Sequence, residues 1–425
     1  MKRIVASVGL VAVGVSGAYA SSLGLAGVDA SKTWSVSATL RGFYDDNYLY
    51  LSRGERDSYG FEVSPAVRFN LPMEQTYLGL SYLYNGRYYA DRDDTVLGQD
   101  NEPWAHSHQF DLMFNHAFSE RYSLDLRDSF VIAQDPEVLA PQGNIPVVFR
   151  KEGNNMRNQA RATFTAQMAP KLGLQLGYNN VWWDYEDDTP VGGTPSYSGR
   201  LDRLEHLGVA NLRWQAQPET TVILGYNLGL VQYTGDEVIN VAPRIVSEDR
   251  DNTSHYVYGG VNQTFLRNLT ASLKLGATYI DYDNERVNEN TWIPFADIST
   301  SFTYARESYF QLGFVHSFNA TDEYRFGNGT ITGSQETSTI YGLLHQQITP
   351  KLAGNVHVHF QDSAFQGGFY DSQTDQYFVL GLNLTYQITR NFSCEAGYDF
   401  SNLDSDIPGR PYDRNRVYLG VTASY

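Results

Sequence analysis

Cysteine, long apolar runs and basic residues are all scarce in this chain of 425 residues. It holds a single cysteine, Cys394, which excludes a disulfide-rich secreted module. Past the first 20 positions, no apolar run approaches the about 20 residues that a membrane-spanning helix needs. Lysine and arginine number 31 against 48 aspartate and glutamate, so the net charge is −17. This charge leaves no positive surface for phosphates and excludes a nucleic-acid partner.

Aromatic residues, in contrast, are abundant. They make up 14% of the chain, with 31 tyrosines, which is too many for a disordered acidic tail. Only 19% of residues are charged, yet the mean hydropathy is −0.39. A large, acidic chain rich in tyrosine and glycine is unusual for a cytosolic enzyme and typical of an outer-membrane barrel.

Residues 1–20 are expected to be a secretory signal peptide. Two basic residues open it, an apolar stretch over 4–15 follows, and Ala18-Tyr19-Ala20 fits a small-x-small cleavage site. The apolar run of about 14 residues is too short for a membrane anchor. Cleavage would leave 29 basic against 48 acidic residues, a net charge of −19. We expect residues 21–32 to be a short periplasmic segment and residues 33–425 to be the barrel.

From residue 33 onward, the chain repeats a unit of about 45 residues: an alternating segment, a short turn, a second alternating segment and a longer polar loop. In residues 378–388, Phe378, Leu380 and Leu382 share one face while Asn383 and Thr385 take the other. Such alternation is typical of a strand with one apolar and one polar face. Counting turns and loops predicts about 18 strands, the first at 34–50 and the last at 413–425.

These strands favour a transmembrane antiparallel up-and-down β-barrel over a soluble propeller or sandwich. Strands of 10–16 residues are long for propeller blades and match tilted membrane spans. Short periplasmic turns alternating with longer extracellular loops are a further barrel feature. Aromatic residues near the strand ends, such as Trp182-Trp183, suit the two membrane interfaces. The last strand ends at Tyr425, the terminal aromatic that we expect the barrel-insertion machinery to recognise.

A set of short motifs lies between Phe43 and Val138: Tyr44-Asp45-Asp46-Asn47, Pro65, His108, Asp128-Ser129-Phe130 and Pro136. With these residues the stretch resembles the family described as Putative beta-barrel porin 2 and related Gram-negative outer-membrane barrels. The Thr-Pro-Lys-Leu and Thr-Arg-Asn-Phe turns continue the likeness to the C-terminus. The resemblance implies a barrel of porin type in the cell outer membrane of a Gram-negative bacterium, with some relatives associated with exopolysaccharide export. It implies no catalytic residues.

Strand alternation also predicts which side chains face the lumen, because a charge facing mid-bilayer lipid costs about 2–4 kcal/mol. We expect a wet channel with a mixed-charge, arginine-rich lining; the alternative is a set of ion pairs that only stiffens the wall. The expected lining residues are Arg41, Arg68, Arg87, Arg127, Arg157, Arg161, Arg203, Arg213, Lys274, Arg416, Glu62, Asp111, Asp125, Glu205, Glu395, Asp399, His357 and His359.

The outer loops are acidic, and we expect an acidic mouth that favours cations over about one Debye length, roughly 8 Å at physiological salt. The spacing of these carboxylates matches no EF-hand loop. The residues assigned to this mouth are Asp91, Asp93, Asp94, Asp184, Glu186, Asp187 and Asp188.

Catalytic and metal sites are not predicted. His357 and His359 share a face, but two imidazoles are too few for a metal site. His106 and His108 lie near acids, as an omptin-like protease would require, but no second aspartate pair can be assigned. A phospholipase-type Ser/His/Asn set is equally unsupported, and there is no phosphate loop, CxxC or HExxH motif. We expect no enzyme activity and no cofactor.

The expected function is passive diffusion of small polar solutes. A TonB-dependent transporter would need a plug and 22 strands. Alternatives are an exopolysaccharide-export pore, which would show aromatic rows such as Tyr256 and Tyr258 facing inward, an outer-membrane enzyme, and a structural or adhesive barrel. The 134–154 loop is the longest and the preferred candidate for a constriction. Expected partners are outer-membrane lipid, lipopolysaccharide, the insertion machinery and a second copy in a homo-oligomer.

Overall fold

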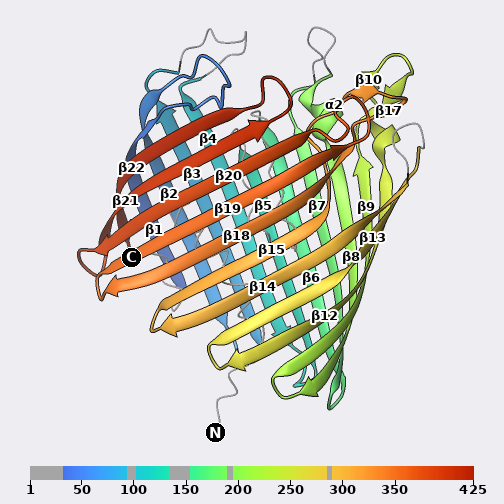
Figure 1. Cartoon of the computed structure of the whole chain (residues 1–425). Helices are drawn as coiled ribbons and strands as arrows, with labels where there is room; N and C mark the ends of the chain where they lie inside the picture. The colour runs from blue at the N-terminus through green and yellow to red at the C-terminus, as the bar shows by residue number, and fades with distance from the viewer. Residues whose placement is uncertain (1–31, 93–101, 134–153, 189–194, 285–289) are drawn as a thin grey trace.

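Eighteen long strands form one closed antiparallel barrel in a computed structural model that describes residues 32–92, 102–133, 154–188, 195–284 and 290–425 (Figure 1). Each strand pairs with its sequence neighbours, and β1 pairs with β22 to close the sheet. The expected architecture of about 18 strands is thereby confirmed. The strands are β1 (Trp34–Asp45), β2 (Ser58–Pro72), β3 (Thr76–Tyr89), β4 (Trp104–Ala117), β5 (Tyr122–Ala133), β6 (Asn155–Ala169), β7 (Leu172–Tyr185), β8 (Arg203–Gln217), β9 (Thr220–Tyr233), β12 (Asn252–Leu266), β13 (Leu269–Tyr282), β14 (Thr291–Ala305), β15 (Ser308–Ala320), β18 (Ser334–Thr349), β19 (Leu352–Gln366), β20 (Thr374–Gln387), β21 (Phe392–Ser405) and β22 (Tyr412–Ser424).

The two ends of the barrel differ in their connections. At one end the strands are joined by turns of two to four residues, and β1 begins and β22 ends there. At the other end longer loops carry small elements of their own (Figure 1). Short periplasmic turns and longer extracellular loops are the usual arrangement in such barrels. The loop elements are α2 (Tyr197–Leu201), β10 (Val238–Asn240), β11 (Ile245–Val246), η1 (Ser247–Arg250), β16 (Phe326–Gly327) and β17 (Thr330–Ile331).

Two strand ends lie four or five residues from the expected positions: the end of the first strand and the start of the strand expected at 295–305. The first strand ends at Asp45 rather than at residue 50, because the Asp45 carboxylate accepts the Asn47 N–H at 3.3 Å and turns the chain. β14 begins at Thr291, so it includes Pro294. Proline is tolerated there because β15 pairs with β14 only from Ala296 onward, which leaves the upper part of β14 bonded on one side.

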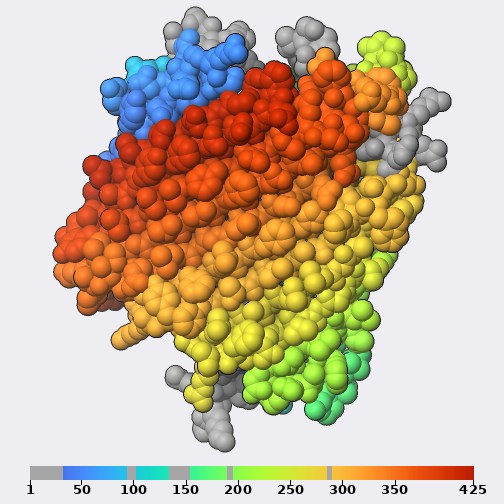
Figure 2. All heavy atoms as spheres, viewed as in Figure 1, coloured from blue at the N-terminus to red at the C-terminus, as the bar shows by residue number. Residues whose placement is uncertain are grey.

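The two faces of the wall have opposite polarity. Large apolar side chains lie on the outside, where Leu419 is 69% and Leu224 is 62% exposed, while Glu62 and Arg41 are buried inside. Apolar residues outside and charged residues inside are the reverse of the arrangement in a soluble protein, and they suit a barrel surrounded by lipid. Figure 2 shows the outer wall over the later strands as a continuous surface without a hollow. None of the helices in the described part of the chain is long and apolar enough to cross a membrane.

Candidate channel lining and outer mouth

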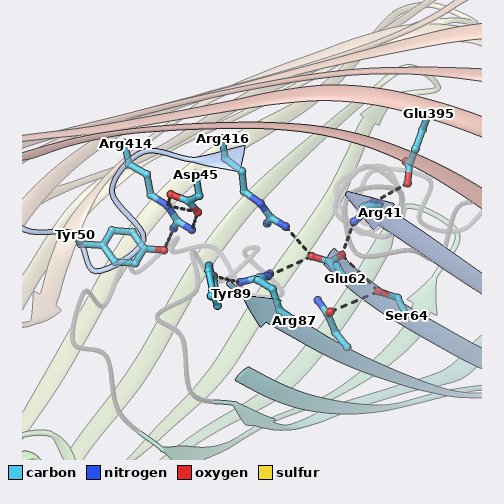
Figure 3. A network of polar contacts seen from close by, with 11 residues as sticks. Arg41, Asp45, Tyr50, Glu62, Ser64, Arg87, Tyr89, Glu395, Arg414 and Arg416 are labelled. Atoms are coloured by element: carbon cyan, nitrogen blue, oxygen red, sulfur yellow. Dashed lines mark hydrogen bonds and ion pairs between the residues drawn. The ribbon is translucent and has the colours of Figure 1, made fainter. Parts of the chain in front are cut away.

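The basic residues of the barrel strands all lie on one face. Residues paired across neighbouring strands share a face, and the face that holds buried Glu62 is the inner one (Figure 3). All eleven strand lysines and arginines lie on this inner face, with nine acids, an excess of two positive charges. The basic residues are Arg41, Arg68, Arg87, Arg127, Arg157, Arg161, Arg203, Arg213, Lys274, Arg414 and Arg416; the acids are Asp45, Glu62, Asp111, Asp125, Glu205, Asp297, Asp375, Glu395 and Asp399.

Glu62 is the centre of an ion-pair network that links five strands. Its Oε1 lies 2.8 Å from Arg41 Nη1, and its Oε2 lies 2.8 Å from Arg416 Nη2 and 3.2 Å from Arg87 Nε. Arg41 Nε also contacts Glu395 Oε1 at 2.6 Å. Figure 3 shows the three guanidinium groups converging on the one carboxylate from β1, β3 and β22. Because Glu62 is 1% exposed, these charges are held by each other rather than by water.

A second inner pair lies nearer the mouth, where the 46–57 loop meets the wall. Arg414 Nε donates to Asp45 Oδ1 at 3.0 Å, and Arg414 also bonds the Tyr50 hydroxyl (Figure 3). The Tyr50 ring lies under the Arg414 guanidinium, 4.3 Å from its Cζ. The loop after the first strand is therefore folded against the inner wall.

Smaller charge groups lie on other strands of the inner wall. Arg127 and Arg161 are register partners on β5 and β6, and Asp125 Oδ1 lies 3.1 Å from Arg127 Nε. Lys274 and Asp297 are also register partners, 2.6 Å apart. The inner face therefore alternates between paired charges and locally positive stretches, as a polar lumen requires.

The histidines fall on both faces. His357 and His359 point inward, and the His357 ring packs over Gly381, where a Cβ would lie 1.7 Å from His357 Cε1. His106 and His108 instead lie on the outer face, so the arrangement required for an omptin-like protease is not formed. Tyr84 and Tyr82 hydroxyls reach their Nδ1 atoms at 2.8 and 3.0 Å. Within the described ranges, no group of three or more His, Cys, Asp or Glu residues is placed to hold a metal ion.

The outer loops carry a strong negative charge. Over the described loop residues, 19 acids face 8 bases, an excess of 11 negative charges. Of the predicted mouth residues, Asp91, Glu186, Asp187 and Asp188 lie in these loops. Asp184 does not: it lies on the outer face of β7, one residue before the strand ends, because alternation continues to Tyr185. The other predicted mouth residues, Asp93 and Asp94, lie outside the described residues, as do the signal peptide 1–20, residues 21–31 and all of the 134–154 loop except Asn154.

Arginine holds these acidic loops together. Arg250 Nη2 donates to the Gly199 carbonyl at 3.1 Å, which joins η1 to α2, and its Cζ lies 3.7 Å from the Tyr233 ring centre. Arg410, in the 406–411 loop, contacts Asp322 at 3.2 Å, Asp375 at 2.8 Å, and Glu323. Loops that are far apart in sequence are thus tied to one another across the extracellular end.

Two loop carboxyl groups, Asp202 and Asp251, have a raised pKa. Asp202 accepts the Tyr185 N–H at 2.7 Å, and Asp251 accepts the Tyr233 N–H at 2.7 Å, so each carboxylate closes the end of a strand. Burial raises the pKa of Asp202 to about 6 and that of Asp251 to about 6, because the charged form loses water. For Asp251 the neighbouring acids Asp283 and Glu248 add to the effect.

Some of these residues were missed by sequence reasoning. Arg414, Asp45 and Asp297 share the inward parity of Arg416, Arg41 and Lys274, so the alternation already contained the signal. Arg250 and Arg410 lie in loops without periodicity, and nothing in the sequence indicated their contacts.

A closed 18-stranded barrel with an apolar outer band and a charged interior defines an outer-membrane β-barrel of the porin type in a Gram-negative bacterium. Residues 326–425 match the family model described as Putative beta-barrel porin 2, so the resemblance expected from the sequence is confirmed over this span. The matched span includes the Thr349-Pro350-Lys351 and Thr389-Arg390-Asn391 turns but not the stretch from Phe43 to Val138. No curated protein matches the chain.

The chain is also similar to several solved structures. OpdK from Pseudomonas aeruginosa is 12% identical over 92% of this chain and 99% of its own, with a TM-score of 0.44. OccAB4 from Acinetobacter baumannii is 13% identical over 93% of this chain and 99% of its own, with a TM-score of 0.44. The ferric enterobactin receptor PfeA of Pseudomonas aeruginosa, as a mutant, is 11% identical over 92% of this chain and 80% of its own, with a TM-score of 0.43. Sequence identities and TM-scores this low assign neither a solute nor a subunit arrangement to this chain.

Proposed function

We propose that this protein is a passive outer-membrane channel for small polar solutes and that it catalyses no reaction. The observation that carries the proposal is the charge pattern along the solute path. Over the described residues, an outer mouth with 11 excess negative charges lies above an inner wall with an excess of two positive charges. Opposed charge layers orient polar solutes and concentrate cations at the entrance.

The inner wall favours small solutes over a glycan chain. Tyr256 and Tyr258 face inward, as the export alternative requires, but they are 5% and 2% exposed. The Tyr258 hydroxyl donates to Asn211 Oδ1 at 2.7 Å, and its ring packs against Phe295. A sugar-guiding row needs open ring faces, and these rings are covered by neighbouring side chains.

The outer wall and the last strand support the proposed lipid and assembly partners. Outer-membrane lipid and lipopolysaccharide would surround the apolar band, and the insertion machinery would recognise β22. Tyr425 supports this role: its N–H donates to the Val36 carbonyl at 2.9 Å, and its ring lies 5.4 Å from Trp34 at the short-turn end.

Planar-bilayer recording of the purified protein tests the proposal. We expect stepwise ion current with a modest cation preference at low salt, which weakens at high salt as the mouth is screened. Adding long maltodextrins should leave the current unchanged, whereas reversible block would favour the export pore. Absence of any current from correctly folded protein would overturn the channel.

A further inference from the structure

The outward face of the barrel breaks its own charge rule at one position. No lysine or arginine of the described strands faces outward, and six of the seven outward acids lie within four residues of an outer strand end. Asp128 is the seventh, five residues from Ala133 and six from Tyr122, between the two ends of β5. Its outward neighbours on β5 are Leu124, Leu126, Phe130 and Ile132.

A mid-strand acid on this face needs a reason. A lipid-facing charge at the bilayer midplane is destabilising, and ionisable groups within the membrane usually mark a functional contact. Asn158 Nδ2 donates to Asp128 Oδ1 at 3.0 Å. Asp128 shares the outward face with its register partners Leu112 and Ala160, so its remaining acceptor positions lie on the outer surface of the wall.

A polar group lies two strands away on the same outward surface. Tyr178 of β7 faces outward, and its hydroxyl lies 2.6 Å from His206 Nδ1 on β8. With the imidazole hydrogen on Nδ1, His206 donates to this hydroxyl, whose own hydrogen then points to an acceptor outside the barrel. The neighbouring Asn180 amide already donates to the Glu205 carbonyl at 3.2 Å. Tyr178 is 45% exposed, so this polar group is presented at the surface. The patch thus has an acceptor, Asp128, on one side and a donor, the Tyr178 hydroxyl, on the other.

Small residues separate the two sides. On β6, Ala160 is the register partner of both Asp128 and Asn180, and Ala162 is the partner of Tyr178. Outward positions of β9 instead carry Leu224, Tyr226, Leu228 and Leu230, all exposed. Small side chains let the outer walls of two proteins in the membrane approach closely enough for their polar groups to form hydrogen bonds.

We propose that the outer face of β5, β6 and β7 is the contact between two copies of this chain. A two-fold axis along the membrane normal, passing through β6 near Ala160 and Ala162, places β5 of each copy opposite β7 of the other. Asp128 of each copy then accepts from the Tyr178 hydroxyl of the second copy, as a two-fold contact requires. A lipid acyl chain offers no donor, and anionic lipopolysaccharide would repel the carboxylate.

Site-directed crosslinking in outer membranes tests this contact. Ala162→Cys, in a Cys394→Ser background, places two thiols beside the axis, where a short bismaleimide can join them. Ala396→Cys is the matched control, because this outward alanine lies on β21, seven strands from β6. We expect an adduct of twice the monomer mass from Ala162→Cys and none from Ala396→Cys.

Asp128→Leu distinguishes the contact from a folding effect. Leucine suits a lipid-facing position, so the variant should keep its folded barrel on unheated gels while the crosslink yield at Ala162→Cys falls about tenfold. Equal yields from the two cysteine positions, an unchanged yield with Asp128→Leu, an adduct of another mass, or a trimer on native mass spectrometry would each overturn the proposal. None of these outcomes depends on whether the barrel conducts.

Discussion

Arg41 and Glu62 are direct register partners on β1 and β2, and their charged groups lie 2.8 Å apart inside the barrel. The same carboxylate also contacts Arg87 and Arg416, so three guanidinium groups share one acid. Neutralising Glu62 would therefore leave this part of the inner wall more positive.

Glu62→Gln should therefore weaken the barrel and make its lumen more positive. Removing one partner of a buried ion pair leaves uncompensated charge and destabilises by about 3–5 kcal/mol. We expect earlier unfolding in urea and a reversal potential shifted toward anions. Glu395→Gln is the control, because Glu395 contacts Arg41 alone among these arginines and should give smaller changes. Equal effects from both variants would contradict the central role of Glu62.

Arg410 should hold the extracellular loops in place. It contacts Asp322, Glu323 and Asp375, so Arg410→Met removes several contacts at once and leaves three acids close together. We expect faster hydrogen exchange in residues 321–333 and noisier single-channel current, with the barrel strands unchanged. Arg306→Met, in an exposed periplasmic turn, is the control and should alter neither measurement. Unchanged exchange in Arg410→Met would refute the role.

Strand alternation could predict the inner wall because the period of two is a local property. Arg41 and Arg416 are 375 positions apart, yet each was assigned its face from its own neighbours. The contact of Arg410 with Asp322 could not be predicted, since both lie in loops whose paths depend on tertiary packing. Asp128 belongs to the family motif Asp128-Ser129-Phe130, and its outward position becomes significant once the register is known.

The predicted acidic mouth can be tested by neutralising its loop acids and comparing the result with neutralisation of Asp184, which lies on the outer face of β7 instead. Replacing Glu186, Asp187 and Asp188 by their amides removes three negative charges from a loop at the entrance, so the cation preference should fall at low salt. Asp184→Asn removes one charge nearby but on the outer face, and should change selectivity little. The comparison is made from reversal potentials in a salt gradient. A larger effect from Asp184→Asn would place the conducting path elsewhere.

Acidification should change both selectivity and loop stability near pH 6. The pKa of Asp202 and of Asp251 is about 6 when folded, against an ordinary value of 3.8. The folded loops keep these protons as the pH rises above 3.8, so the stability that they contribute is complete below pH 3.8 and is lost as the pH rises from there through about 6. Cation preference should fall as the pH is lowered through 6, because two negative charges are neutralised.

The double variant Asp202→Asn with Asp251→Asn isolates this titration. It should show the low-pH selectivity at pH 7.5 and lose the step near pH 6, as measured by reversal potentials from pH 7.5 to 5. A step that survives in the double variant would assign the titration to other groups.

Gly381 should be required for the close approach of the His357 ring. A Cβ at Gly381 would lie 1.7 Å from His357 Cε1, so Gly381→Ala forces the ring away from the wall and should destabilise the barrel by about 1–3 kcal/mol. Gly259→Ala is the matched control, since nothing lies within 4 Å of its Cβ position. Urea unfolding in lipid vesicles measures both. If Gly381→Ala is as stable as Gly259→Ala, the ring can leave its place freely and its inward packing has no structural role.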